Sequence, residues 1–264
     1  QTKLSVLPPR FMQLAIEQFR LSIARVRDLI AIHNSLKSQT TSALDVSDIL
    51  RAALVLTVSA LDYYIHEVVT LGMLEIYRGQ RSEPSPTPNS SQSAFSRFQV
   101  SLDGARQERL IAISIGSWLE NEIQQNYGSF FDQESHSISE VLPMIENLLT
   151  NKLNSNYWLE TEIRENLRYK SFQQPDKIAE AIRLISAKKL WEEVASKLNK
   201  PAKDIKSQLS IIVERRNKIA HEADIDPSYG IGSRWNIDEN LVNDAVTFIE
   251  QLVENIHQVL EDIH

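Results

Sequence analysis

Residues 52–61 constrain the fold most, because their apolar side chains point in almost every direction around a helix. A helix that is apolar all round has to be buried among other elements of the protein. Asp45 or Ser47 supplies a cap residue before this segment, and the helical pattern continues to about Arg78. The chain is therefore expected to fold around one long, central helix.

Helical spacing of apolar residues recurs through the rest of the chain. Pro8 and Pro9 open a helix that is expected to run to about Ser35, since proline is tolerated in a first turn. We expect further helices near residues 105–126, 138–152, 155–169, 175–186, 190–199 and 237–263, and one that starts at 201. No strand pattern and no internal repeat stand out, so the predicted fold class is all-α.

The clearest break in these patterns is the segment at about 81–92, which holds three prolines and many hydroxyl side chains but no hydrophobic residue. The helices on either side of it are too few to form separate cores. We therefore expect a mobile, exposed Pro/Ser-rich loop within a single all-α domain over residues 1–264.

The overall charge of −7 argues against a general nucleic-acid coat, because phosphate contacts need Lys and Arg. The charge is uneven, however. Residues 164–218 hold 14 Lys and Arg against 7 Asp and Glu, and the chain after Lys218 holds ten acids and one base, Arg234. This pattern indicates either the ordinary uneven charge of long surface helices or a basic patch with acidic surroundings.

Cysteine is absent, which excludes a disulfide framework and a thiolate metal site. No apolar run is long enough to predict a membrane span, and the first residues do not resemble a signal peptide. We therefore expect a cytoplasmic protein that does not interact with a membrane.

Residues 214–224 bring Arg216, Asn217 and His221 together near the end of an amphipathic helix. A cation that holds a phosphate and an imidazole that titrates near neutrality are what RNA cleavage without a metal needs. On a helical wheel Arg216 falls on the apolar stripe, whereas Arg215 points away from it. A guanidinium directed at a core needs a carboxylate or a phosphate to satisfy it.

Arg216 and His221 diverge by about 140° on an ideal helix, so one copy of the helix does not bring both to one phosphate. Two copies related by a twofold axis would place two Arg and two His in one cleft, and we therefore expect a homodimer. The same spacing also arises by chance in helices. In that case His221 would only cap the carbonyls at the helix end.

The run of residues 215–224 resembles the motif of the HEPN superfamily, and residues 50–64 resemble the second helix of its RiboL-PSP type. Residues 169–173 and 177–178, with Trp191, add to a resemblance that covers about residues 44–226. The resemblance implies a HEPN-like helical bundle with additional helices, which dimerises with its motifs facing each other. It also implies metal-independent endoribonuclease activity, often in toxin–antitoxin or antiphage systems.

Carried over by residue, Arg216 and His221 match the invariant pair of the motif, and Asn217 matches its polar second position. Asp62 is a weaker match to an acidic residue on an adjacent helix. Arg216 would then hold the scissile phosphate, His221 would act as general base or acid, and Asn217 would orient His221 or bond the phosphate. Asp62 would either pair with Arg216 or serve helix packing alone.

The predicted reaction is attack by a ribose 2′-OH, which leaves a 2′,3′-cyclic phosphate and needs no cofactor. The predicted partners are RNA, a second copy of the chain, and an antitoxin or a defence-system protein. One alternative is a non-catalytic HEPN module that binds a nucleotide, RNA or a partner protein. Another is a purely structural role for Arg216 in a buried ion pair.

Several further side chains are candidates for a site. Asp62 and His66 have metal-ligand spacing, but no third ligand stands near, so no metal site is predicted. Trp235 either contacts a nucleotide or anchors its loop. Three other tryptophans fall on apolar stripes and are expected in the core: Trp118, Trp158 and Trp191. The candidate RNA contacts are Arg215, Lys218, Tyr229, Arg234 and Trp235.

Overall fold

The computed structural model describes residues 11–39, 41, 44–86, 93–98, 122–125, 128, 137–154 and 156–261. Its named helices are α1 (Phe11–Gln39), α2 (Ser47–Tyr77), α4 (Ile138–Asn154), α5 (Asn156–Leu167), α6 (Pro175–Ile182), α7 (Leu190–Leu198), α8 (Ala202–Glu222) and α9 (Glu239–Glu261). Within the described ranges the only extended pairing is an isolated bridge between Ile225 and Arg234. The predicted all-α class is therefore confirmed. Most of the helix expected at 105–126 lies outside the described residues.

The chain divides into two compact units. Residues 1–96 and 171–264 form the first, which contains α1, α2 and α6 to α9, and residues 97–170 form the second, which contains α4 and α5. The single domain expected from the sequence stays a prediction. At the start of the expected loop, the Arg81 Nε donates to the Glu75 carboxylate at 2.9 Å and Pro84 is buried, so this end is anchored. Residues 87–92 lie outside the described residues.

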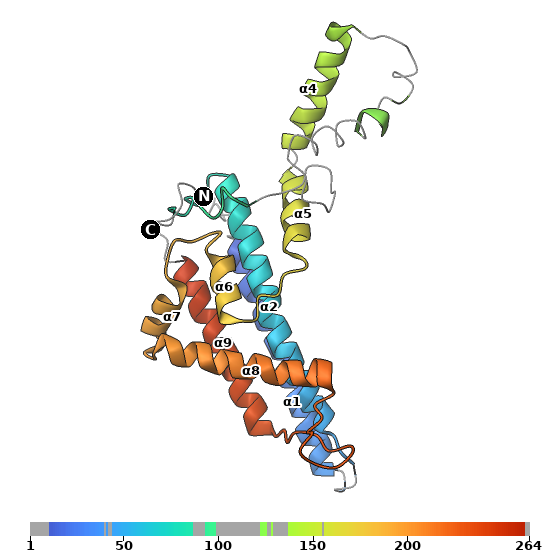
Figure 1. The fold of residues 1–264 in the computed structure, drawn as a ribbon, viewed down its shortest axis with the longest axis vertical. Helices are drawn as coiled ribbons and strands as arrows, with labels where there is room; N and C mark the ends of the chain where they lie inside the picture. Colours follow the sequence, from blue (N-terminus) through green and yellow to red (C-terminus); the bar gives the residue numbers. More distant parts are fainter. Residues whose placement is uncertain are drawn as a thin grey trace, which may run out of the picture. The chain divides into compact units, whose positions relative to one another are not determined.

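α2 is the central helix of the first unit (Figure 1). It contacts α1, α6, α8 and α9, and α1, α2 and α9 lie side by side while α8 crosses α2. By length and composition α2 could cross a membrane, but 56% of its most apolar window is buried inside the fold. That degree of burial is typical of a core helix.

Burial of α2 is not uniform around its axis. Leu54, Val58 and Leu61 are fully enclosed, as expected for residues 52–61. Ala52 and Leu56 are exposed, so the helix is buried in the fold as expected but leaves one apolar face uncovered. No described part of the chain covers that face, and α2 therefore presents an apolar stripe to its surroundings.

α1 and α9 pack on α2 through side chains that the helical period directs inward. At the centre of this packing the Tyr64 hydroxyl lies 3.2 Å from the His257 Nδ1, and Phe19 meets the Tyr64 ring edge-on. On the outside, the Arg20 guanidinium pairs with the Glu254 carboxylate at 2.7 Å through two hydrogen bonds. These contacts fix three helices against one another.

The short helices α6 and α7 contact each other and α8; α6 also packs on α2, and α7 on α9. Trp191 is buried and its indole nitrogen donates to the Pro175 carbonyl at 3.0 Å, which confirms its predicted place in the core. Trp158 is half-buried, and Trp118 lies outside the described residues.

α8 begins after Pro201 and buries Ile205, Leu209, Ile212 and Val213. The helix ends because Ala223 and Asp224 both adopt left-handed backbone angles, with φ of 51° and 58°. The Asp224 amide then donates back to the Lys218 carbonyl at 3.0 Å. Left-handed angles are unfavourable for residues other than glycine, so other contacts have to hold this turn in place.

Candidate functional site

Arg216, Asn217 and His221 lie on the last two turns of α8. The Arg216 Nη1 donates to the Asn217 Oδ1 at 3.1 Å, while the Arg216 Nε is buried without a hydrogen-bond partner. No carboxylate in the described part of the chain pairs with Arg216. His221 is exposed, and its imidazole makes no hydrogen bond or ion pair with another described residue. Both side chains are therefore available to a ligand.

Arg215, the neighbour of Arg216, is committed to a buried ion pair. Its Nη2 donates to the Asp224 Oδ2 at 2.8 Å, and its Nη1 lies 2.7 Å from the Asp224 Oδ1. The Asp224 side chain is 0% exposed and that of Arg215 only 15%. The prediction that Arg215 points away from the core was wrong, and the structural ion pair considered for Arg216 belongs to Arg215. The reason is that the turn after α8 folds Asp224 back beneath Arg215.

Arg51 of α2 is the second cation on the same carboxylate. Its Nε donates to the Asp224 Oδ2 at 2.7 Å, and its Nη2 donates to the Trp235 carbonyl at 2.9 Å. Arg215 also donates to the Trp235 carbonyl, at 3.2 Å. A buried carboxylate needs such partners, because the loss of hydration on burial costs roughly several kcal/mol of free energy per charge. The cluster therefore ties α2, α8 and the chain after α8 together.

Two effects act in opposite directions on the pKa of Arg215. Burial lowers the pKa of the Arg215 guanidinium, and the Asp224 carboxylate acts in the opposite direction. A guanidinium stays charged in proteins even when its pKa is lowered. Arg215 therefore remains a cation within the pair.

The importance of Arg51 and Asp224 was missed from the sequence. Arg51 carried a usable signal, because it is a charged residue next to the most apolar segment of the chain, and a buried charge implies a buried partner. Asp224 carried no comparable signal, because it lies beyond the helix end.

Asp62 does not pair with Arg216 in this structure. Its Oδ1 accepts from the Phe172 amide at 2.6 Å and its Oδ2 accepts from the Gln173 side chain at 3.1 Å. This is the packing alternative, in which α2 anchors the segment before α6. The His66 Nε2 is 3.9 Å from Asp62, and the described residues contain no group of three or more metal-ligating side chains.

The other candidate RNA contacts surround the end of α8. The Lys218 Nζ lies 4.7 Å from the centre of the Trp235 ring, and the Trp235 amide donates to the Asp224 carbonyl at 2.9 Å. Arg234 pairs with the carboxylates of Asp45, at 2.6 Å, and Asp48. The main chain of Trp235 thus anchors the loop, as one alternative proposed. Tyr229 is exposed, and contact of these residues with RNA stays a prediction.

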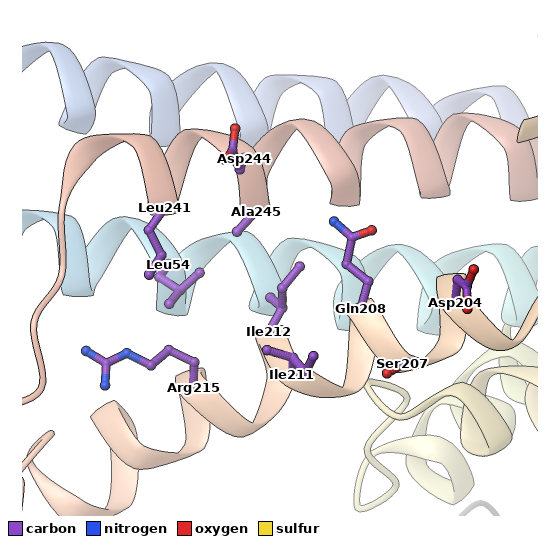
Figure 2. A pocket seen from close by; sticks show the side chains of 10 residues that line it. All are labelled: Leu54, Asp204, Ser207, Gln208, Ile211, Ile212, Arg215, Leu241, Asp244 and Ala245. Carbon is purple, nitrogen blue, oxygen red and sulfur yellow. The ribbon is translucent and has the colours of Figure 1, made fainter. Parts of the chain in front are cut away.

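Two pockets adjoin α8. One, of about 530 Å³, is lined by side chains of α2, α8 and α9, with Arg215 at one end and Asp204 at the other (Figure 2). The second, of about 560 Å³, borders the last turn of α8 and the exposed stripe of α2. Its lining is mostly apolar and includes Leu56, Ile219 and Ala223, with Arg51 and Arg234 among the polar residues.

Comparison with known proteins identifies a family for this chain. No curated protein and no solved structure matches the chain. The model of the RiboL-PSP-HEPN family matches residues 21–262, a range that contains both the central helix α2 and the motif at the end of α8. Because this match extends over most of the sequence, the chain belongs to the RiboL-PSP-HEPN family.

Proposed function

We propose that this protein is a metal-independent endoribonuclease in which Arg216 and His221 are the catalytic residues. HEPN domains are commonly ribonucleases. The observation that carries the proposal is the contrast between two adjacent arginines. Arg215 is held in a buried ion pair with Asp224, whereas Arg216 has no carboxylate partner among the described residues. The buried Nε of each arginine lacks a hydrogen-bond partner, so the carboxylate is what distinguishes them. A scissile phosphate is an anion that would satisfy Arg216.

In the proposed reaction, His221 takes the proton of a ribose 2′-OH or delivers a proton to the leaving 5′-oxygen. The 2′-oxygen attacks phosphorus, the bond to the 5′-oxygen breaks, and the products are a 2′,3′-cyclic phosphate and a 5′-hydroxyl. Arg216 stabilises the negative charge that grows on the phosphate oxygens. Asn217 holds the Arg216 guanidinium through their 3.1 Å hydrogen bond, and this contact gives Asn217 a role in orienting the cation.

The proposed enzyme is a homodimer. Arg216 and His221 leave the helix in different directions, so a second copy is needed to complete a cleft around one phosphate. The exposed stripe of α2 supports this arrangement, because Leu56, which lines the second pocket, is 46% exposed, and Tyr63, about two helical turns further along, is 49% exposed. Contiguous exposed apolar surface marks protein interfaces. A role as a toxin or antiphage effector, with an antitoxin or defence partner, is proposed from the family resemblance.

A non-catalytic module is the second candidate function. The unpartnered Arg216 Nε fits anion binding as well as catalysis. This candidate predicts that RNA or a nucleotide binds, that binding weakens in Arg216→Ala, and that no product forms.

The test is cleavage of a mixed-sequence RNA by purified protein in excess EDTA. Wild type is expected to cut, and His221→Ala is expected to leave the RNA intact while its circular dichroism spectrum stays helical. Glu222→Ala is the matched control, because it removes an adjacent exposed side chain from the same turn. Equal cutting by wild type and His221→Ala contradicts the proposal, and binding without cutting by wild type favours the second candidate.

A further inference from the structure

Three charged residues close a loop of chain around the proposed catalytic pair. Arg215 precedes Arg216, and Asp224 follows His221 by three positions, so their ion pair brackets both residues. Arg51 bonds the same carboxylate from α2 at 2.7 Å. These three residues are called the ionic clasp below.

The main chain of Asp224 is hydrogen-bonded as well as its side chain. The Asp224 amide donates to the Lys218 carbonyl at 3.0 Å, and the Asp224 carbonyl accepts from the Trp235 amide at 2.9 Å. Ala223 and Asp224 stay in unfavourable left-handed angles within these bonds. The amide, the carbonyl and the Oδ2 of Asp224 are thus all hydrogen-bonded, and these bonds set the direction in which α8 ends.

The charged groups of the clasp are directed at one another, although Arg215 and Arg51 also border the two pockets. The Asp224 side chain is 0% exposed, and the guanidinium groups of Arg51 and Arg215 are directed at it. His221, in contrast, is exposed and has no partner of its own among the described residues. The position of its imidazole therefore depends on where the last turn of α8 is held.

We propose that Arg51, Arg215 and Asp224 are positioning residues, which fix the end of α8 against α2 so that Arg216 and His221 of each copy are held in place for the shared cleft of the proposed dimer. The inference rests on the proposed ribonuclease activity and adds residues that act through the catalytic pair. Because Arg51 belongs to α2, the clasp also places the motif relative to the exposed stripe proposed as the dimer surface.

A clasp and a simple buried charge pair differ in what they require of residue 215. A charge pair is satisfied by any cation. The clasp requires a planar group whose Nη2 bonds both the Asp224 Oδ2 and the Trp235 carbonyl while its Nη1 lies beside the Asp224 Oδ1, which lysine cannot supply. Arg215→Lys therefore keeps the charge and loses the geometry.

The experiment measures kcat and KM for RNA cleavage by Arg215→Lys. Displacement of a catalytic group by about 1 Å can cost about 100-fold in rate. We expect kcat to fall by about 10- to 100-fold, with KM close to that of wild type. Glu75→Gln is the matched control, because it breaks another largely buried pair, that of Glu75 with Arg81, whose side chains are 12% and 9% exposed. The control is expected to lose stability but to keep its kcat.

A kcat for Arg215→Lys equal to that of Glu75→Gln overturns the inference and leaves the proposed function standing. If wild type cuts no RNA, the proposed function fails, and the imidazole resonances of His221 in nuclear magnetic resonance spectra test the clasp alone. A shifted or broadened His221 signal in Arg215→Lys supports the clasp, and an unchanged signal overturns it. Should Arg215→Lys not fold, Arg51→Lys carries the same comparison.

Discussion

Arg215→Ala and Arg216→Ala are expected to separate stability from activity in neighbouring residues. Arg215→Ala removes one of two cations from Asp224, whose side chain has no exposure to solvent. Removal of one partner from a buried pair costs about 3–5 kcal/mol. Arg51 remains 2.7 Å from Asp224 and Arg215 is partly exposed, so we expect a loss near the lower end, about 3 kcal/mol.

Arg216→Ala removes one hydrogen bond, to Asn217, and no ion pair within the described residues. The expected loss of unfolding free energy is therefore below about 1 kcal/mol. Urea unfolding followed by far-ultraviolet circular dichroism gives both values, provided that the slopes with urea agree. RNA cleavage is expected to disappear in Arg216→Ala. A loss of stability in Arg216→Ala as large as in Arg215→Ala would refute this assignment of roles.

Three further predictions follow from other parts of the structure. Burial lowers the pKa of His257 below its ordinary value of 6.5, so the unfolded chain binds the extra proton and unfolding free energy falls as the pH drops below about 6.5. His257→Gln is expected to flatten this dependence between about pH 7 and 5, measured by urea unfolding at each pH, and an unchanged slope contradicts it. Gly72→Ala places a methyl group 2.9 Å from two carbons of Ile185 and is expected to cost about 1–3 kcal/mol. The same substitution should cost less when it is made in an Ile185→Ala background, whereas a stabilised single variant speaks against the close contact. Leu56→Glu or Tyr63→Glu puts a charge on the proposed dimer surface and is expected to give a monomeric mass by light scattering, while an unchanged mass excludes this face as the interface.

The helices were predictable because the signal for each is local. The apolar period and the proline at 201 indicated the start of α8, which begins at Ala202, and the second predicted helix corresponds to α2 (Ser47–Tyr77). Spacing of side chains along one segment decides which face is buried, and no distant contact is needed to see it. The exposure of Leu56 was not predictable in this way. An apolar residue on a helix looks the same in the sequence whether or not another part of the chain packs against it.

The buried ion pair of Arg215 was not predicted, for a related reason. A helical wheel considers α8 alone and places Arg216 on the apolar stripe. The wheel does not show that the left-handed turn at Ala223 and Asp224 brings the Asp224 carboxylate to Arg215, where Arg51 of α2 also bonds it. Both contacts depend on chain beyond the helix, so helical periodicity could not reveal them. The short motif itself was visible, because its residues are adjacent in sequence.

The most direct test of the account is cleavage of an RNA in which the ribose at one mapped cut site is replaced by 2′-deoxyribose. The reaction is followed in EDTA with wild-type protein. Attack by the 2′-OH predicts that cutting stops at the modified position and continues at the unmodified sites. The fragments cut at the unmodified sites are expected to end in a 2′,3′-cyclic phosphate. Cutting at the modified position at the unmodified rate would contradict the mechanism proposed for Arg216 and His221.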